Sequence, residues 1–242
     1  MIFLFSDYGL KGPYIGQVET VLQLLMPQVK VINLMADAPR NNPKASAYLL
    51  ASLIKHIPAS AILFCVVDPG VGTDIDSPVA LNIDRNWFVG PDNGLFDIVC
   101  RRAGSIKAME ITWRPESLSS SFHGRDLYAP ICARIASDDL DFGRPFTWQD
   151  THDWPDDLYE IICIDHFGNC ITGLRASITD KNKVIEIAGE RIKYAASFGT
   201  VKSGEVFWYA NSNGLVEIAV NQENAEKFCE LKIGDKLIIH DE

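Results

Sequence analysis

The chain of 242 residues contains 47% hydrophobic and 22% charged residues, proportions typical of a folded globular protein. This length is enough for one large domain or two modest ones. The formal net charge of −10 argues against a nucleic-acid backbone or an anionic membrane surface as the main partner, because both would repel an acidic protein. A small cationic substrate is compatible with this charge.

Six cysteines are scattered mostly through apolar stretches, and no two stand at the spacing of a zinc knuckle or a redox motif. We therefore expect buried, reduced thiols in a cytoplasmic protein. Residues 1–7 are typical of a first strand and not of a signal peptide, because no basic segment precedes an apolar run that ends after five residues. No apolar run approaches the length of a membrane span, so no membrane partner is expected.

The first half of the chain alternates between strand and helix patterns. Strands are expected at residues 2–5, 29–35, 61–67, 79–83 and 87–89, and helices at residues 13–26, 43–56 and 92–102. The run 61–67 is continuously apolar, which is typical of a parallel strand covered on both faces. The alternation predicts an α/β domain with a mostly parallel sheet over residues 1–145.

The composition changes over residues 143–157, which are rich in aspartate, tryptophan and proline. We interpret residues 146–155 as a linker. Beyond it, strands are expected at residues 158–165, 170–176, 183–187, 206–210, 215–220 and 236–240, with glycine or asparagine turns between them. This pattern predicts a small all-β domain, a barrel, over residues 156–242.

Two carboxylates follow apolar strands of the first half: Asp7 in Ser-Asp-Tyr-Gly, and Asp68 in Val-Val-Asp-Pro-Gly-Val-Gly. Ligands bind outside the carboxyl ends of parallel strands, so we expect the two to lie close together. Asp7 is suited to accept two hydrogen bonds from a ribose diol, or to cap a turn. The glycines after Asp68 allow a ligand to approach the backbone, or simply end the strand.

His123 stands in Ser-Phe-His-Gly-Arg-Asp, where an imidazole beside a carboxylate is suited to act as a general base or to orient water. Alternatively, His123 caps a loop, and Arg125 and Asp126 form a structural ion pair. In the second half, the segment 165–169 offers Phe167 for stacking on a flat base and an asparagine for hydrogen bonds. Because no dinucleotide, triphosphate or compact metal motif is present, we expect neither a cofactor nor a metal.

Taken together, these strings resemble the S-adenosyl-L-methionine hydroxide adenosyltransferases, relatives of the fluorinase and chlorinase, from Phe3 to about Ile239. The matching strings are Ser-Asp7-Tyr-Gly, Val-Val-Asp68-Pro-Gly-Val-Gly-Thr, Gly-Pro-Asp92-Asn-Gly-Leu, Ser-Phe-His123-Gly-Arg-Asp, Asp165-His-Phe-Gly-Asn and Asn211-Ser-Asn-Gly-Leu-Val-Glu-Ile-Ala-Val-Asn221. The resemblance implies an α/β domain followed by a β-barrel. It also implies homotrimers whose active sites lie between the N-domain of one subunit and the C-domain of its neighbour.

The resemblance implies a reaction in which water or hydroxide displaces methionine from the ribose 5′ carbon of S-adenosylmethionine, leaving adenosine. Asp68 and His123 match two members of the family's Asp-Arg-His set that activates water, and Asp7 would hold the ribose hydroxyls. The implied substrate-binding residues are Asp7, Gly124, Asp165, Phe167, Asn169, Ser212, Glu217, Val220 and Asn221.

The sequence departs from the family where its catalytic arginine is expected, because that position is Ile75. The family has an acidic residue at a second position, and the corresponding residue in this chain is Gly12. An isoleucine side chain donates no hydrogen bond, so Arg125, Lys11 or Arg40 would have to substitute, or hydrolysis would be slow, or the protein would bind without turnover.

Four interpretations follow. The first is an S-adenosylmethionine hydrolase, of full or reduced activity. The second is a non-catalytic binder of adenosine or S-adenosylmethionine, motivated by Ile75. A halide-dependent adenosyltransferase is less favoured, because the fluorinase's insertion has no counterpart between Gly72 and Pro91 and because His123 fits the hydroxide enzymes. A structural trimer without a ligand would leave the polar strings unexplained.

Overall fold

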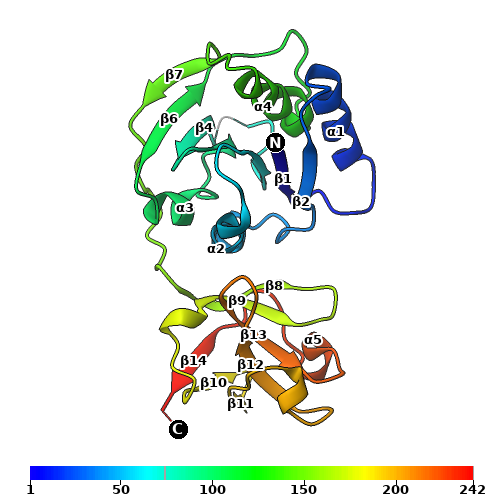
Figure 1. Ribbon diagram of the computed structural model, residues 1–242, viewed down its shortest axis with the longest axis vertical. Helices are drawn as coiled ribbons and strands as arrows, with labels where there is room; N and C mark the ends of the chain where they lie inside the picture. Colours follow the sequence, from blue (N-terminus) through cyan, green and yellow to red (C-terminus); the bar gives the residue numbers. More distant parts are fainter. Residues whose placement is uncertain (74, 242) are drawn as a thin grey trace. The chain divides into compact units, whose positions relative to one another are not determined.

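The computed structural model describes residues 1–73 and 75–241, and the chain divides into two compact units, Met1–Asp153 and Trp154–Glu242. Figure 1 shows helices and a large sheet in the first unit and mostly strands in the second. The predicted combination of an α/β domain and a β domain is therefore confirmed.

The first unit is built on a seven-stranded mixed sheet in the order β2-β1-β3-β5-β4-β6-β7. Its strands are β1 (Ile2–Ser6), β2 (Val31–Met35), β3 (Ile62–Val66), β4 (Pro78–Ile83), β5 (Asn86–Pro91), β6 (Ile106–Ile111) and β7 (Gly143–Phe146). Strands β2, β1, β3 and β5 pair in parallel, whereas β4, β6 and β7 are added by antiparallel pairing. The sheet is thus mostly parallel in its first part and antiparallel toward β7.

Helices cover this sheet on both faces (Figure 1). They are α1 (Tyr14–Leu25), α2 (Pro43–Leu53) with a 3-10 turn η1 (Ile54–His56), α3 (Asp97–Arg101), and α4 (Ala129–Ala136), which continues a π-helical turn η2 (Gly124–Tyr128). The side chains of Leu4 and Phe64 pack with Val18 of α1 and Ile131 of α4 in one buried cluster. The alternation of side chains along each strand sends the intervening residues to the opposite face, toward α2 and α3.

The sequence prediction missed three elements of this unit. Helix α4 spans only eight residues, five of them buried, so its sequence is too short to show a recognisable helical period. Strands β6 and β7 are partly exposed and carry charged residues and a proline, so neither shows a clean alternation. The expected helix 92–102 is wrong in its first five residues, which form a turn where the Asn93 side chain donates to the Val67 carbonyl (2.9 Å).

The second unit contains two antiparallel sheets. One has the order β12-β13-β9-β8 and the other β11-β10-β14. The strands are β8 (Leu158–Ile164), β9 (Cys170–Arg175), β10 (Val184–Ile187), β11 (Glu190–Ile192), β12 (Val206–Ala210), β13 (Leu215–Val220) and β14 (Leu237–His240), with 3-10 turns η3 (Ala176–Ile178) and η4 (Phe198–Thr200) and helix α5 (Ala225–Phe228). All six predicted strands are present, and residues from both sheets form one buried cluster.

All six cysteines are free, and only Cys229 is not fully buried. Burial raises the pKa of the Cys170 thiol to about 12. Within the two described stretches of the chain, no helix has the length and apolar character needed to cross a membrane.

Candidate active site

Asp7 and Asp68 follow two neighbouring parallel strands. Ser6 of β1 is paired with Val66 of β3, so the two carboxylates leave the sheet at the same edge. The chain runs from β1 to β2 on one side and then to β3 on the other, which makes this edge a topological switch point. The predicted proximity is reflected in their electrostatics, because Asp7 contributes to the raised pKa of Asp68.

Each of the two carboxylates accepts a hydrogen bond from a backbone N–H group. The amide of Asn41 donates to Asp7 Oδ2 (2.8 Å), and the amide of Gly70 donates to Asp68 Oδ1 (3.1 Å). Burial raises the pKa of both carboxyl groups, and these hydrogen bonds oppose the rise. Both residues are only partly buried, so their carboxylates remain accessible to a ligand.

A cavity of about 470 Å³ opens beside Asp68. Its charged and polar lining includes Asp68, Asp76, Glu110, Arg114, His123 and Tyr128, together with the turn that follows Asp68. The Asp76 carboxylate raises the pKa of Asp68 further, and His123 lowers it. The structure thus brings Asp68 and His123, the two predicted catalytic residues, to one pocket.

Gly124 follows His123 and supports the pocket through packing. A Cβ atom on Gly124 would lie 1.9 Å from the hydroxyl oxygen of Tyr8 and 3.2 Å from the Phe64 ring. The Tyr8 ring in turn packs edge-on against Phe122, with ring centroids 5.5 Å apart. A side chain at position 124 would therefore displace Tyr8, which follows Asp7 directly.

The cations proposed to replace the arginine occupy different places. Arg125 is engaged by Asp126 (Nε to Oδ1, 2.6 Å) and by Gln17 (Nη1 to Oε1, 2.9 Å). Arg40 lowers the pKa of Asp7, and Lys11 is exposed. None of these three lines the cavity beside Asp68.

Sequence reasoning missed Arg114, the cavity's one arginine or lysine among the residues that the structure describes. Its Nη1 atom donates to the carbonyls of Ile111 (2.8 Å) and Trp113 (2.9 Å). Arg114 follows strand β6, which the sequence did not reveal, so no signal drew attention to it. The Ile75 side chain is 78% exposed and does not line the cavity.

A second cavity, of about 630 Å³, lies on the C-terminal unit. Its lining consists of Asp165, Phe167, Asn169, Phe198, Tyr209, Val220, Gln222, Glu223 and Asn224. Phe167 is 74% exposed, and the rings of Phe198 and Tyr209 pack edge-on with centroids 5.4 Å apart. Aromatic faces beside an amide and carboxylates suit a flat heterocycle with polar edges.

The predicted binding residues of this unit fall into two groups. Asp165, Phe167, Asn169 and Val220 line the cavity. Three others do not: Glu217 is buried, Ser212 is exposed in the turn after β12, and the Asn221 side chain donates to the Val201 carbonyl (2.9 Å). Tyr209 was missed because an aromatic residue in a strand is more often part of a core, and Phe198 was missed because it lies in the 3-10 turn η4, where the sequence predicts no element.

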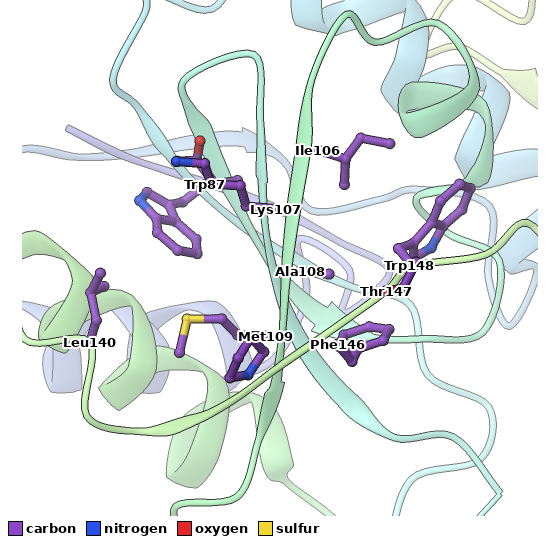
Figure 2. A pocket seen from close by; sticks show the side chains of 11 residues that line it. Trp87, Ile106, Lys107, Ala108, Met109, Leu140, Phe146, Thr147 and Trp148 are labelled. Carbon is purple, nitrogen blue, oxygen red and sulfur yellow. The ribbon is translucent and has the colours of Figure 1, made fainter.

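A third cavity, of about 670 Å³, lies on the first unit and is lined by none of the residues above (Figure 2). Trp87, Met109, Leu140, Phe146 and Trp148 give it an apolar lining. It shares no residue with the other two cavities and holds no carboxylate or imidazole. Across residues 1–73 and 75–241, no group of three or more histidine, cysteine, aspartate or glutamate side chains is placed to hold a metal ion.

These features define a two-domain protein whose α/β unit carries a carboxylate–imidazole pocket and whose β unit carries an aromatic–amide pocket. The sequence profile of the SAM hydroxide adenosyltransferase N-terminal domain matches residues 2–142, and that of the C-terminal domain matches residues 159–238. The chain belongs to this family. The resemblance drawn from the sequence is confirmed.

Curated relatives are similar over almost the full chain. A protein of Thermus thermophilus is 34% identical over 96% of both chains and is named (R)-S-adenosyl-L-methionine hydrolase. A protein of Salinispora tropica is 30% identical over 96% of this chain and 94% of the relative, and it has the same name. A protein of Methanocaldococcus jannaschii, also of that name, is 28% identical over 99% of this chain and 95% of the relative.

Two solved structures share the fold. An uncharacterized conserved protein from Thermotoga maritima superposes with a TM-score of 0.88 at 26% identity. A conserved hypothetical protein from Thermus thermophilus gives a TM-score of 0.80 at 32% identity. Both comparisons cover 99% of each chain.

Proposed function

We propose that this protein is an enzyme that hydrolyses S-adenosyl-L-methionine to adenosine and methionine. The observation that carries this proposal is its similarity, along nearly the whole chain, to curated relatives named for that activity. The pocket formed by Asp68 and His123 supplies groups that suit the chemistry. The acidic protein also attracts a substrate that carries a positive sulfonium.

The reaction is a displacement at the ribose 5′ carbon. A bond forms between the water oxygen and this carbon as the carbon–sulfur bond breaks, and its electron pair neutralises the sulfonium as methionine leaves. The released proton passes to the Asp68 carboxylate, with His123 orienting the water. Because the sulfonium is already a good leaving group, alignment of the nucleophile supplies much of the rate, and orientation of this kind is worth about 7–11 kcal/mol.

We assign the remaining family residues to substrate binding. Asp7 holds the ribose hydroxyls through its partly buried carboxylate. Phe167 and Asn169 contact the adenine, supported by their place in the second cavity. The other proposed binding residues contact the substrate or support the residues that do. They are Gly124, Asp165, Ser212, Glu217, Val220 and Asn221.

The finer features of the proposal rest on the family resemblance. We propose a homotrimer in the cytoplasm, with each active site formed by the N-domain of one subunit and the C-domain of its neighbour. The C-terminal strands would form a closed barrel, and the reaction would need neither a metal nor a cofactor. Nucleic acids and membranes are not expected partners of this acidic chain.

A second candidate function is a protein that binds adenosine or S-adenosylmethionine without turnover. The observation that favours it is the outward-facing Ile75 where the family has its arginine. In this alternative the pocket would keep its carboxylates and lose the hydrogen-bond donor that polarises water.

The two candidates are separated by incubating the purified protein with S-adenosylmethionine in halide-free and in chloride buffer and separating the products by chromatography. The hydrolase predicts adenosine and methionine in both buffers. A binder predicts no product but a higher Tm with adenosine, by mass action. A chlorinated nucleoside formed only with chloride would instead identify a halide-dependent adenosyltransferase.

A further inference from the structure

Tyr128 lies at the end of the π-helical turn η2, five residues after His123. The turn is closed by the backbone N–H of Ala129, which donates to the Gly124 carbonyl. A turn of this kind is wider than an α-helical turn and occurs often at functional sites. The side chains of Tyr128 and His123 both line the cavity beside Asp68. The turn thus brings a phenol and an imidazole to the pocket of the candidate base.

The Tyr128 ring is enclosed, whereas its hydroxyl group is open. The whole residue is only 2% exposed and belongs to the buried cluster that contains Phe64 and Ile131. Within residues 1–73 and 75–241 the hydroxyl makes no hydrogen bond, yet its oxygen is not one of the buried atoms left without a partner. The oxygen is therefore accessible. The cavity is the space that it faces, because the rest of the side chain is surrounded by protein.

This phenol is suited to donate a hydrogen bond and not to act as a base. Burial raises the pKa of Tyr128, and the negative charge of Asp68 raises it further. A tyrosine with a raised pKa keeps its proton at neutral pH. Because no acceptor in the described protein takes up this O–H group, it is available to water or to a ligand in the cavity.

Ile75 cannot supply a hydrogen-bond donor of this kind. Water that attacks a carbon needs an acceptor for the proton it releases, which Asp68 provides, and needs one lone pair directed at the carbon. A hydrogen bond donated to its other lone pair fixes the rotation of the water molecule. Arg114 is an alternative donor of the cavity, but its Nη1 atom already donates to the carbonyls of Ile111 (2.8 Å) and Trp113 (2.9 Å). The Tyr128 hydroxyl has no such partner.

We infer that the Tyr128 hydroxyl is a catalytic group that donates a hydrogen bond to the attacking water, in place of the arginine that the family has at position 75. The inference deepens the proposed function and rests on it. As the carbon–oxygen bond forms and the carbon–sulfur bond breaks, one water proton passes to Asp68, and Tyr128 keeps its own proton throughout. Tyr128 and Asp68 thus hold the water from two sides, beside His123.

The test measures adenosine formation from S-adenosylmethionine by the unchanged protein and by Tyr128→Phe, which removes one oxygen and keeps the ring. We expect kcat to fall by about five- to tenfold, the usual contribution of a neutral hydrogen bond. KM should stay within about twofold, because the lost bond is made to water and not to the substrate. Tm should change little, because the hydroxyl bonds to no other group of the described protein. A loss in kcat alone separates a catalytic role from a structural one.

Tyr14→Phe is the matched control. It makes the same change in the same unit, at an exposed side chain that lines none of the three cavities, and should leave kcat unchanged. An unchanged kcat in Tyr128→Phe, or an equal loss in Tyr14→Phe, overturns the inference. A loss found only in Arg114→Gln also overturns it and identifies Arg114 as the donor. If the unchanged protein forms no adenosine, the proposed function itself fails, and the inference fails with it.

Discussion

The Asp68 carboxylate combines partial burial with a neighbouring imidazole, as a general base requires. We predict that Asp68→Asn lowers kcat by about 10²–10⁴-fold, the usual contribution of a positioned base. Adenosine binding should remain close to that of the unchanged protein, because Asp68 acts on the water and not on the nucleoside. Turnover and calorimetric titration measure the two quantities, and undiminished turnover would remove Asp68 from the mechanism.

The charge of Asp76 affects the ionisation of Asp68, so a change at Asp76 should alter the pH dependence of the reaction. Asp68 must be ionised to accept a proton, and the negative charge of Asp76 raises its pKa. Removing that charge in Asp76→Asn lowers the pKa of Asp68, so the acidic limb of the kcat/KM profile should move to lower pH by up to about one unit. Glu116→Gln, an exposed change, should leave the profile in place. A shift to higher pH would contradict this assignment.

The turn between His123 and α4 supports the site through the close packing of Gly124 against Tyr8. Since a Cβ at position 124 would overlap the Tyr8 hydroxyl, we predict that Gly124→Ala destabilises the protein by about 1–3 kcal/mol. The matched change is Gly16→Ala in α1, where a Cβ meets nothing within 4 Å; it should be neutral or stabilising by up to about 1 kcal/mol. Thermal unfolding of both variants measures the difference in stability. Equal Tm values would show that Tyr8 moves aside without loss of stability.

Elements whose local pattern matched their surroundings could be predicted from the sequence. Strand β3 is continuously apolar and is buried at every position, and the strands of the second unit are bounded by clear turns. Helix α4 and strand β6 could not be predicted, because neighbours distant in the sequence determine which of their faces are buried. Helix α4 has only eight residues, which are too few for its helical periodicity to be recognised.

The residues of the candidate site also divide into those that could be predicted from the sequence and those that could not. Asp7 and Asp68 could be placed together, since the carboxyl ends of adjacent parallel strands meet. Arg114 and Tyr209 could not, because their relevance depends on strand pairing, β6 to β4 and β12 to β13, which brings them to the cavities.

At the scale of the whole molecule, the two pockets lie on separate compact units, the carboxylates on the first and the aromatic–amide cavity on the second. The proposed reaction uses groups of both pockets, because Asp68 and His123 line the first and Phe167 and Asn169 line the second. The proposal therefore predicts that catalysis requires both units, contributed either by one chain or by two.

The proposed trimer predicts that two inactive variants restore one another. Asp68→Asn damages the first unit and Asn169→Ala the second, so each alone should be almost inactive. In a trimer that contains both variants, a site between subunits is intact where an undamaged first unit meets an undamaged second unit, which holds for about one site in three. Activity near one third of the unchanged protein, measured on trimers purified through a different tag on each variant, is the expected result. A site within a single chain would give no recovery at all, because every chain would carry one damaged half.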